Sequence, residues 1–402
     1  EIGYLLRSAG FNEVAARIEQ NLTSQTDKGQ QSAVLSPPFQ AIPALPYFVG
    51  RQALIHQIEE ILLTDPVYRA CCLHGMAGVG KTALATQMAY RLRPHFPDGV
   101  LWANSQRSTP MTILSTFGRA FGEDVSQYPD LESRSQVVRQ LLANKAVLLV
   151  LDDVWHGQDV LPLLPPSTGK TAVIVTTRRL DLFATVGMHR LEVGPFDTSQ
   201  QVSLQLFGRF LAEDLTTAKA STLSEISDLL GHLPLAVAIA ASRLAYEPSW
   251  TPEAFLERLH QTRQKLAEVE FEDQSVQISF AASYALLEPK LQTFFSLMGV
   301  FEAREFTPAA AAAVAQIPQR QAEDFLRKLY ALSLCQLGRG DAPQARFRLH
   351  PLLSQYAEET AVALDHLPQA HYRLINYFVD YGEKHQGNHQ RLALEANNAT
   401  AL

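Results

Sequence analysis

The sequence predicts an α/β P-loop-type domain, with a parallel sheet and helices on both faces, followed by a helical domain and a winged-helix domain. Three observations predict this architecture. Between about 47 and 195, short apolar runs alternate with amphipathic helical patterns, which is typical of parallel sheets. From about 196 the strand signals stop and amphipathic helices follow. Farther along, helical patterns precede two short apolar segments separated by "RGDAPQA", which indicates a β-hairpin and hence a winged helix.

Four buried strands are expected in the first domain. Buried parallel strands are nearly continuous apolar runs, because helices cover both of their faces. Helical patterns such as "TALATQMAYRLRPHF" and "SQVVRQLLAN" lie between these runs. The expected strands are "ACCLH" (70–74), "GVLWAN" (99–104), "AVLLVLD" (146–152) and "AVIVTT" (172–177).

Composition excludes several classes of protein. A formal net charge of -7 argues against a general nucleic-acid binder, which usually has a basic balance. No apolar run reaches the ~18 residues that a membrane span needs. Cys71, Cys72 and Cys335 do not form a disulfide framework. We expect them to be buried structural thiols, with Cys71 and Cys72 on opposite faces of a strand, and we expect a reducing cytoplasm.

The stretch "GMAGVGKT" after the first strand indicates a phosphate-binding loop. Its glycines and the residues Lys81 and Thr82 match the spacing G-x-x-x-x-G-K-[ST]. Glycines let backbone N–H groups turn toward phosphate oxygens, and the next helix directs its positive end at the same anion. An ordinary strand–turn–helix is the alternative. We expect ADP or ATP, with contacts from Gly75, Gly78, Val79, Gly80, Lys81, Thr82 and Ala83.

Carboxylates and a cation follow two of the expected strands. Asp152 is expected to hold Mg²⁺ together with Thr82, and Asp153 to orient the attacking water or a neighbouring group. The next residue is Val154 rather than Glu, so we expect slow ATP hydrolysis. Arg178, after "VIVTT", is expected to sense the γ-phosphate. A solvated acidic loop and a surface arginine are the alternatives.

Seven motifs in order resemble the NB-ARC family of STAND (signal-transducing) P-loop ATPases, which includes apoptosis regulators and plant disease-resistance (NLR) proteins and has many bacterial members. The resemblance covers about 46–362. Its motifs are "YFVGR" (47–51), "GMAGVGKT", "LLVLDDVW", "TTR", "LGHLPLA" (230–236), "SFAASYALL" (279–287) and "FRLHPLLSQYA" (347–357).

The resemblance implies further nucleotide contacts. Val49 and Arg51 match the residues that bracket adenine, and Pro234 matches the proline that packs on the base. His350 matches the histidine of the family's Met-His-Asp motif, which contacts the β-phosphate of ADP in the closed form. Here Pro351 replaces the Asp and cannot make the interactions of a carboxylate.

The chain is expected to divide into six segments. Because it begins at Glu1 and stops inside an amphipathic pattern, we expect further residues at both ends of the natural protein. The segments are the end of an N-terminal effector or adaptor unit (1–22), a linker (23–46), the nucleotide-binding domain (47–195), the helical domain (196–263), the winged-helix domain (264–365) and the start of a helical, tetratricopeptide-like repeat region (366–402).

The resemblance implies a signalling switch. Such a protein is a slow ATPase that uses the nucleotide to change state rather than for repeated catalytic turnover. ADP would hold a closed resting state, and ATP an open state that self-associates and activates an N-terminal effector, in bacterial immunity or programmed cell death. A trigger would act on a region beyond residue 402. The core is expected to contact neither membrane nor nucleic acid. The alternative is a STAND-type transcription regulator acting on DNA; a small-molecule kinase is disfavoured because no acceptor pocket is indicated.

Overall fold

The computed structural model describes residues 37–65, 69–105, 108–165, 169–179, 188–247, 249–266, 274–302, 304–338 and 345–385. The expected N-terminal unit, most of the expected linker and the last seventeen residues of the expected repeat region lie outside these ranges. Two compact units are distinguished: an N-terminal unit (Val34–Leu244 with Ser249–Ser279) and a C-terminal unit (chiefly Phe280–Leu402). The predicted domain boundaries stay predictions.

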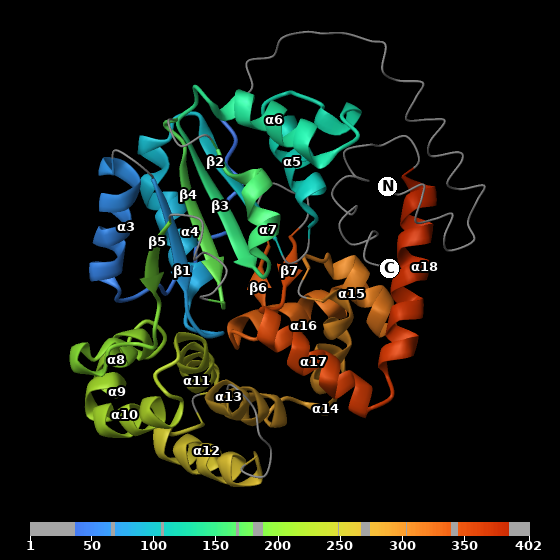
Figure 1. The fold of residues 1–402 in the computed structure, drawn as a ribbon. Helices are drawn as coiled ribbons and strands as arrows, with labels where there is room; N and C mark the ends of the chain where they lie inside the picture. The colour runs from blue at the N-terminus through green and yellow to red at the C-terminus, as the bar shows by residue number, and fades with distance from the viewer. Residues whose placement is uncertain are drawn as a thin grey trace. The chain divides into compact units, whose positions relative to one another are not determined.

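A five-stranded parallel sheet forms the centre of the N-terminal unit (Figure 1). Its order is β2-β3-β4-β1-β5, so the first strand in the sequence lies between the fourth and the fifth. This confirms the predicted parallel α/β fold. The strands are β1 (Ala70–His74), β2 (Gly99–Asn104), β3 (Val147–Val154), β4 (Ala172–Thr177) and β5 (His189–Glu192).

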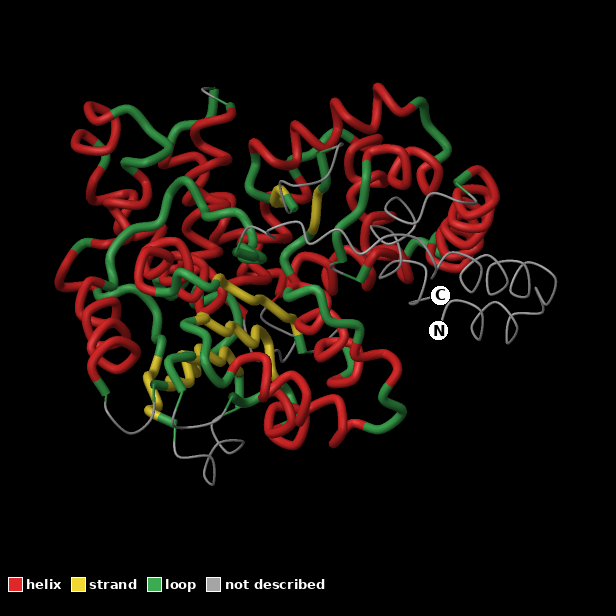
Figure 2. The backbone as a smooth tube through the Cα atoms, turned by 90° about the horizontal axis from the view of Figure 1, so that it is seen from above, coloured by secondary structure: helices red, strands yellow, loops and turns green. Residues whose placement is uncertain are grey.

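Helices cover both faces of this sheet, as Figure 2 shows from above with the strands in yellow. The helices α3 (Gln52–Thr64) and α4 (Lys81–Leu92) contact β1, β3 and β4. On the other face, α5 (Pro110–Ala120) and α6 (Leu131–Leu142) share one apolar cluster with alternate residues of the strands. Because strand side chains alternate, Cys72 joins this cluster while Cys71 faces the other side, as expected. Burial raises the pKa of the Cys72 thiol to about 12.

A helical block completes the N-terminal unit. The amphipathic pattern over 223–245 forms two helices, because Gly231 (φ 60°) and His232 (φ 52°) adopt left-handed backbone conformations and Pro234 begins the next helix. The helices are α8 (Val202–Phe207), α9 (Glu213–Ala218), α10 (Ala220–Leu229), α11 (Pro234–Tyr246) and α12 (Pro252–Leu266), and α13 (Gln274–Ala285) follows.

The C-terminal unit contains the three helices and the hairpin of a winged helix. The antiparallel strands β6 (Gln336–Leu337) and β7 (Phe347–Arg348) form the predicted hairpin, and Phe306 makes an isolated antiparallel bridge to Phe347. The side chain of Thr307 accepts from the N–H of Ala310 and so caps the second helix. The helices are α14 (Pro289–Leu297), α15 (Pro308–Ala315) and α16 (Gln319–Ala331), followed by α17 (Pro351–Ala363) and α18 (Leu367–Lys384).

Short helical turns join these elements. Among the described residues, no helix is both long enough and apolar enough to cross a membrane. The turns are η1 (Arg93–His95), η2 (Val125–Gln127), α7 (Gly157–Val160), η3 (Leu161–Leu163), η5 (Thr198–Gln200) and η6 (Met298–Phe301).

Candidate functional site

The loop between β1 and α4 has the backbone that the glycine pattern predicts. Gly75, Gly78 and Gly80 have φ of 149°, 77° and 91°, in the region that favours glycine. A Cβ on Gly75 would lie 2.2 Å from the carbonyl oxygen of Val193, so no side chain fits there. Gly80 is the N-cap residue of α4, and Ala83 lies in its first turn. The loop can therefore approach an anion at the helix N-terminus.

Lys81 is the cation of this loop. Its side chain is only 8% exposed, and its Nζ donates to the carbonyl oxygens of Gly75 at 2.7 Å and Met76 at 2.8 Å. Both acceptors belong to the loop itself. The ammonium is thus held where phosphate oxygens would lie, in surroundings that favour a bound anion.

Asp152 receives two hydroxyl groups from two different elements. Thr82 at the start of α4 donates to its Oδ1 at 2.8 Å, and Thr176 on β4 donates to the same oxygen at 2.7 Å. Asp152 is 4% exposed, and within the described part of the chain its Oδ2 accepts no hydrogen bond. One carboxylate oxygen is fixed, and the other is left for a further ligand.

A β-bulge in β3 produces this arrangement. Leu151 pairs with Val175 and Val154 with Thr177, so Asp152 and Asp153 together stand opposite the single residue Thr176. Asp153 has a φ of 54°, and its N–H donates to Oγ1 of Thr176 at 2.9 Å. The Thr176 hydroxyl therefore binds both acidic residues, one through its carboxylate and one through its backbone.

Arg178 lies at the tip of β4 between two groups from the end of β3. Its Nε is 3.8 Å from Oδ1 of Asp153, and its guanidinium lies 5.4 Å from the centre of the Trp155 ring. The predicted residues Asp152, Asp153 and Arg178 are thus brought to the same edge of the sheet.

The oxygen atoms at this edge fit Mg²⁺. Among the described residues no group of three or more His, Cys, Asp or Glu side chains could hold a metal. Mg²⁺ is usually held by one or two carboxylates together with phosphates and waters, so Thr82 and Asp152 suffice. Asn104 pairs in register with Asp152 and faces the same side, and its Oδ1 is buried without a partner in the described chain. A coordinated water beside Asp152 would satisfy this oxygen.

Arg51 and the start of α11 are joined to the phosphate loop. The guanidinium of Arg51 donates to the carbonyl oxygens of Val79 at 2.8 Å and Gly194 at 2.6 Å. Burial lowers the pKa of Arg51 to about 10, so this group remains a cation at neutral pH. The N–H of Leu235, next to Pro234, donates to the carbonyl oxygen of Gly78 at 3.3 Å. Both predicted adenine-side elements meet the loop through backbone oxygens.

The other two predicted residues lie in different places. Val49 is buried two residues before Arg51. His350 belongs to the C-terminal unit, where its Nδ1 accepts from the N–H of Leu352 at 3.3 Å and caps α17. Leu349, the residue before it, is buried. The contacts of Val49, Arg51, Pro234 and His350 with a nucleotide stay predictions.

Sequence reasoning assigned no role to Thr176, Asn104 or Trp155. Each lies at the carboxyl end of a strand or just beyond it, at the edge where parallel sheets bind ligands. Their position at or just after the end of an apolar run is the feature of the sequence that could have indicated a role for all three. Their partners depend on the strand order and on the bulge in β3, which the sequence does not reveal.

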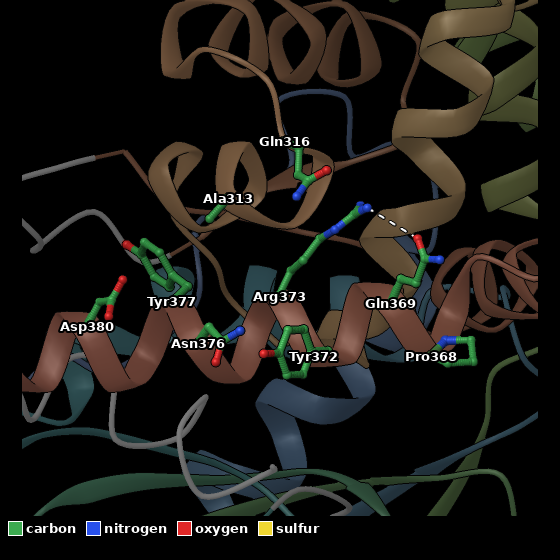
Figure 3. Close-up of a pocket in the computed structure, with 9 residues that line it drawn as sticks. All are labelled: Ala313, Gln316, Pro368, Gln369, Tyr372, Arg373, Asn376, Tyr377 and Asp380. Carbon is green, nitrogen blue, oxygen red and sulfur yellow. Dashed lines mark hydrogen bonds between the residues drawn. The ribbon is translucent and has the colours of Figure 1, made fainter.

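A groove of about 640 Å³ lies in the C-terminal unit between α15 and α18 (Figure 3). Arg373 is the one cation among its lining residues, and it donates to the carbonyl oxygen of Val314 at 3.1 Å and to Gln369 at 3.3 Å. The first contact joins α18 to α15, and the second lies within α18. We assign no ligand to this groove.

This chain is similar to a known protein family and to several known proteins. Residues 51–206 match the family described as the NB-ARC domain. The regulatory protein AfsR of Streptomyces coelicolor is 33% identical over 327 residues, which cover 78% of this chain and 32% of that protein. AfsR of Streptomyces griseus is 32% identical over 353 residues, covering 86% of this chain and 35% of that protein. The chain therefore spans about a third of the length of these relatives.

A plant protein is similar over a shorter stretch. A putative disease resistance protein of Arabidopsis thaliana is 30% identical over 165 residues, covering 39% of this chain and 18% of that protein. Bacterial regulatory proteins and plant disease-resistance proteins are thus both similar to this chain, as the motif order predicted.

Proposed function

Because the chain belongs to the NB-ARC family through residues 51–206, we propose that it is a nucleotide-dependent signalling switch. ADP stabilises a closed resting state, and exchange for ATP stabilises an open state that self-associates. The chain is a nucleotide-binding protein of the P-loop class. The nature of the nucleotide and its use as a switch are our proposal.

The observation that carries the proposal is the hydrogen-bonded row of Thr82, Asp152 and Thr176 beneath the loop that holds Lys81. Thr82 and Asp152 supply the hard oxygens that would hold Mg²⁺, and Lys81 supplies a cation for the β and γ phosphates. When bound, Mg²⁺ neutralises negative charge on the phosphates. Thr176 keeps the Asp152 carboxylate pointed at this position.

The same edge of the sheet favours a switch over rapid turnover. The residue after Asp153 is Val154, whose side chain is buried in the apolar cluster and cannot accept a proton. Asp153 itself lies beside Arg178. Asp153 orients the attacking water or a neighbouring group, and Arg178 senses the γ-phosphate. Without a glutamate base, this arrangement supports slow hydrolysis.

The remaining residues complete the nucleotide site in our proposal. Val49 and Arg51 bracket the adenine and Pro234 packs on the base, since Arg51 and the start of α11 already contact the loop. His350 contacts the β-phosphate of ADP and holds the C-terminal unit in the closed state. A difference of a few kcal/mol between ADP and ATP suffices to shift the population of two states.

We extend the proposal to regions that lie outside this chain. An N-terminal effector is activated by self-association, and a trigger acts on a C-terminal region, in bacterial immunity or programmed cell death. The buried, free thiols of Cys71, Cys72 and Cys335 suit a reducing cytoplasm.

Action on DNA is the competing function, because the relatives from Streptomyces are named regulatory proteins and the C-terminal unit is a winged helix. The charges of α16, the third helix of the winged helix, argue against DNA binding through this helix. Arg327 lies 4.0 Å from Glu323 and 3.5 Å from Asp324, and Lys328 lies 3.5 Å from Glu288. A mobility shift of duplex DNA that is lost at modest salt would favour this alternative.

Multiple-turnover ATP hydrolysis tests the switch. We expect far fewer than one turnover per second and a larger native mass with ATP than with ADP. A rate near the ~10 per second that is typical of enzymes would overturn the proposal. Asp153→Asn is the matched variant for a water-orienting role and should slow hydrolysis further without preventing ATP binding.

A further inference from the structure

The aromatic ring of Trp155 lies beside Arg178, the proposed γ-phosphate sensor. Trp155 follows β3, Arg178 follows β4, and the guanidinium lies 5.4 Å from the centre of the indole ring. We propose that Trp155 is a positioning residue for Arg178, which it holds ready to distinguish ATP from ADP. The inference rests on the proposed role of Arg178 as the γ-phosphate sensor.

The bulge in β3 creates this pairing. Because Val154 pairs with Thr177, the next residues along the two neighbouring strands are Trp155 and Arg178. Without the extra residue, Val154 would stand beside Arg178 and the indole would lie one position farther along. The bulge that turns Asp152 and Asp153 toward Thr176 thus also places the ring beside the sensor.

The acidic partner alone holds Arg178 loosely. Its Nε lies 3.8 Å from Oδ1 of Asp153, near the outer limit of an ion pair, and the arginine side chain is 27% exposed. A guanidinium within about 6 Å of an indole centre gains cation–π attraction, which is strongest for Trp among the aromatic residues. The ring therefore restricts a side chain that would otherwise have many rotamers.

The indole acts through its face rather than through its N–H group. Nε1 of Trp155 is buried and has no hydrogen-bond partner within the described part of the chain. A phenyl ring retains the face and removes the unsatisfied donor. Trp155→Phe is therefore the conservative variant, and Trp155→Leu is the variant that removes the aromatic face while retaining apolar bulk.

The test compares ATP and ADP affinities in four variants of the full chain. Three are the single variants Trp155→Leu, Trp155→Phe and Arg178→Ala, and the fourth is the double variant that combines Trp155→Leu with Arg178→Ala. We expect Trp155→Leu to lower the ratio of ATP affinity to ADP affinity, here called the ATP preference, by about fivefold. This is the factor expected for one exposed cation–π contact. Trp155→Phe should change the preference less than twofold. The double variant should equal Arg178→Ala, because the ring acts only through the arginine.

The possible failures are distinguishable. If Arg178→Ala leaves the ATP preference unchanged, the sensor role in the proposed function is wrong. If Arg178→Ala changes the preference and Trp155→Leu does not, or if their losses add in the double variant, the positioning role of Trp155 is wrong. Thermal unfolding of each variant shows whether a loss comes from misfolding.

Fluorescence provides a second measurement that needs no change at Trp155. The chain has three tryptophans, so Trp102→Phe combined with Trp250→Phe leaves Trp155 as the sole emitter. We expect its emission to differ between the ADP and ATP complexes, and the difference to vanish in Arg178→Ala. Identical emission in both complexes would overturn the inference.

Discussion

The hydroxyl of Thr176 donates a hydrogen bond of 2.7 Å to Oδ1 of Asp152, across the neighbouring strands β4 and β3. The same hydroxyl accepts the N–H of Asp153 at 2.9 Å, where two residues of the bulged strand stand opposite one. A residue to which the sequence alone assigned no role thereby fixes both members of the acidic pair.

Replacing Thr176 tests this connection. Thr176→Val keeps the shape but leaves the N–H of Asp153 without its acceptor and Asp152 with only Thr82. We expect the affinity for Mg²⁺–ADP to fall about tenfold, since a hydrogen bond to a charged group contributes ~1.5–3 kcal/mol. Titration calorimetry with and without Mg²⁺ measures the change.

Thr177→Val is the matched control. Thr177 is equally buried, but its hydroxyl donates to the carbonyl oxygen of Val154 at 2.7 Å and not to an acidic side chain. This variant should lose stability and keep its Mg²⁺ dependence. Equal losses of nucleotide affinity in the two variants would show that the Thr176 hydroxyl has no special role.

The phosphate loop tolerates no side chain at its first glycine. We expect Gly75→Ala to cost about 2 kcal/mol or more, because its Cβ would lie 2.2 Å from a backbone oxygen. The unfolding temperature should fall by about 4–8 °C in a unit of this size. Gly194→Ala, with no atom within 4 Å of the added Cβ, should unfold like the wild type. Similar midpoints for both variants would contradict the loop geometry.

Arg51 connects the loop to the segment after β5. One nitrogen of its guanidinium, Nη2, donates to the carbonyl oxygens of both Val79 and Gly194, and a lysine side chain is one atom too short to place its nitrogen there. We expect Arg51→Lys to weaken ADP binding by roughly fivefold, the loss of about one hydrogen bond. Arg190→Lys, at an exposed position on β5, should bind ADP normally. An unchanged affinity in Arg51→Lys would remove this residue from the site.

His350 has a structural role that must be separated from its predicted contact with ADP. Its Nδ1 caps α17, so His350→Ala removes both the cap and the imidazole. His350→Asn retains a capping side chain and removes only the imidazole. If the imidazole contacts ADP, both variants should release ADP faster and favour the assembled form. Wild-type ADP release in His350→Asn would mean that the residue only caps the helix.

Much of the fold could be predicted from sequence because buried strands in a parallel sheet are apolar throughout. The strands β1, β2 and β4 begin and end where their apolar runs do, and β3 continues through its acidic pair to Val154. The edge strand β5, His189–Glu192, has no such signal because its residues are largely exposed and polar. The break at Gly231 and His232 interrupts a pattern that is apolar on both sides.

The site could be predicted only as far as residues adjacent in sequence determine it. The glycine loop, Lys81 and Thr82 form one turn and one helix start, so their spacing defines them. The contacts of Thr176 with Asp152, and of Trp155 with Arg178, join different strands. They depend on β3 lying next to β4 and on a bulge whose extra residue shifts the register.

The most direct measurement is the nucleotide that the purified chain carries. The chain is purified without added nucleotide and denatured, and the released nucleotide is identified by chromatography, alongside Lys81→Ala and the exposed control Lys170→Ala. The account predicts about one ADP per chain in the wild type and the control, and none in Lys81→Ala, which loses charge-assisted contacts to phosphate. A wild-type chain that is empty and takes up neither ADP nor ATP with Mg²⁺ would contradict it.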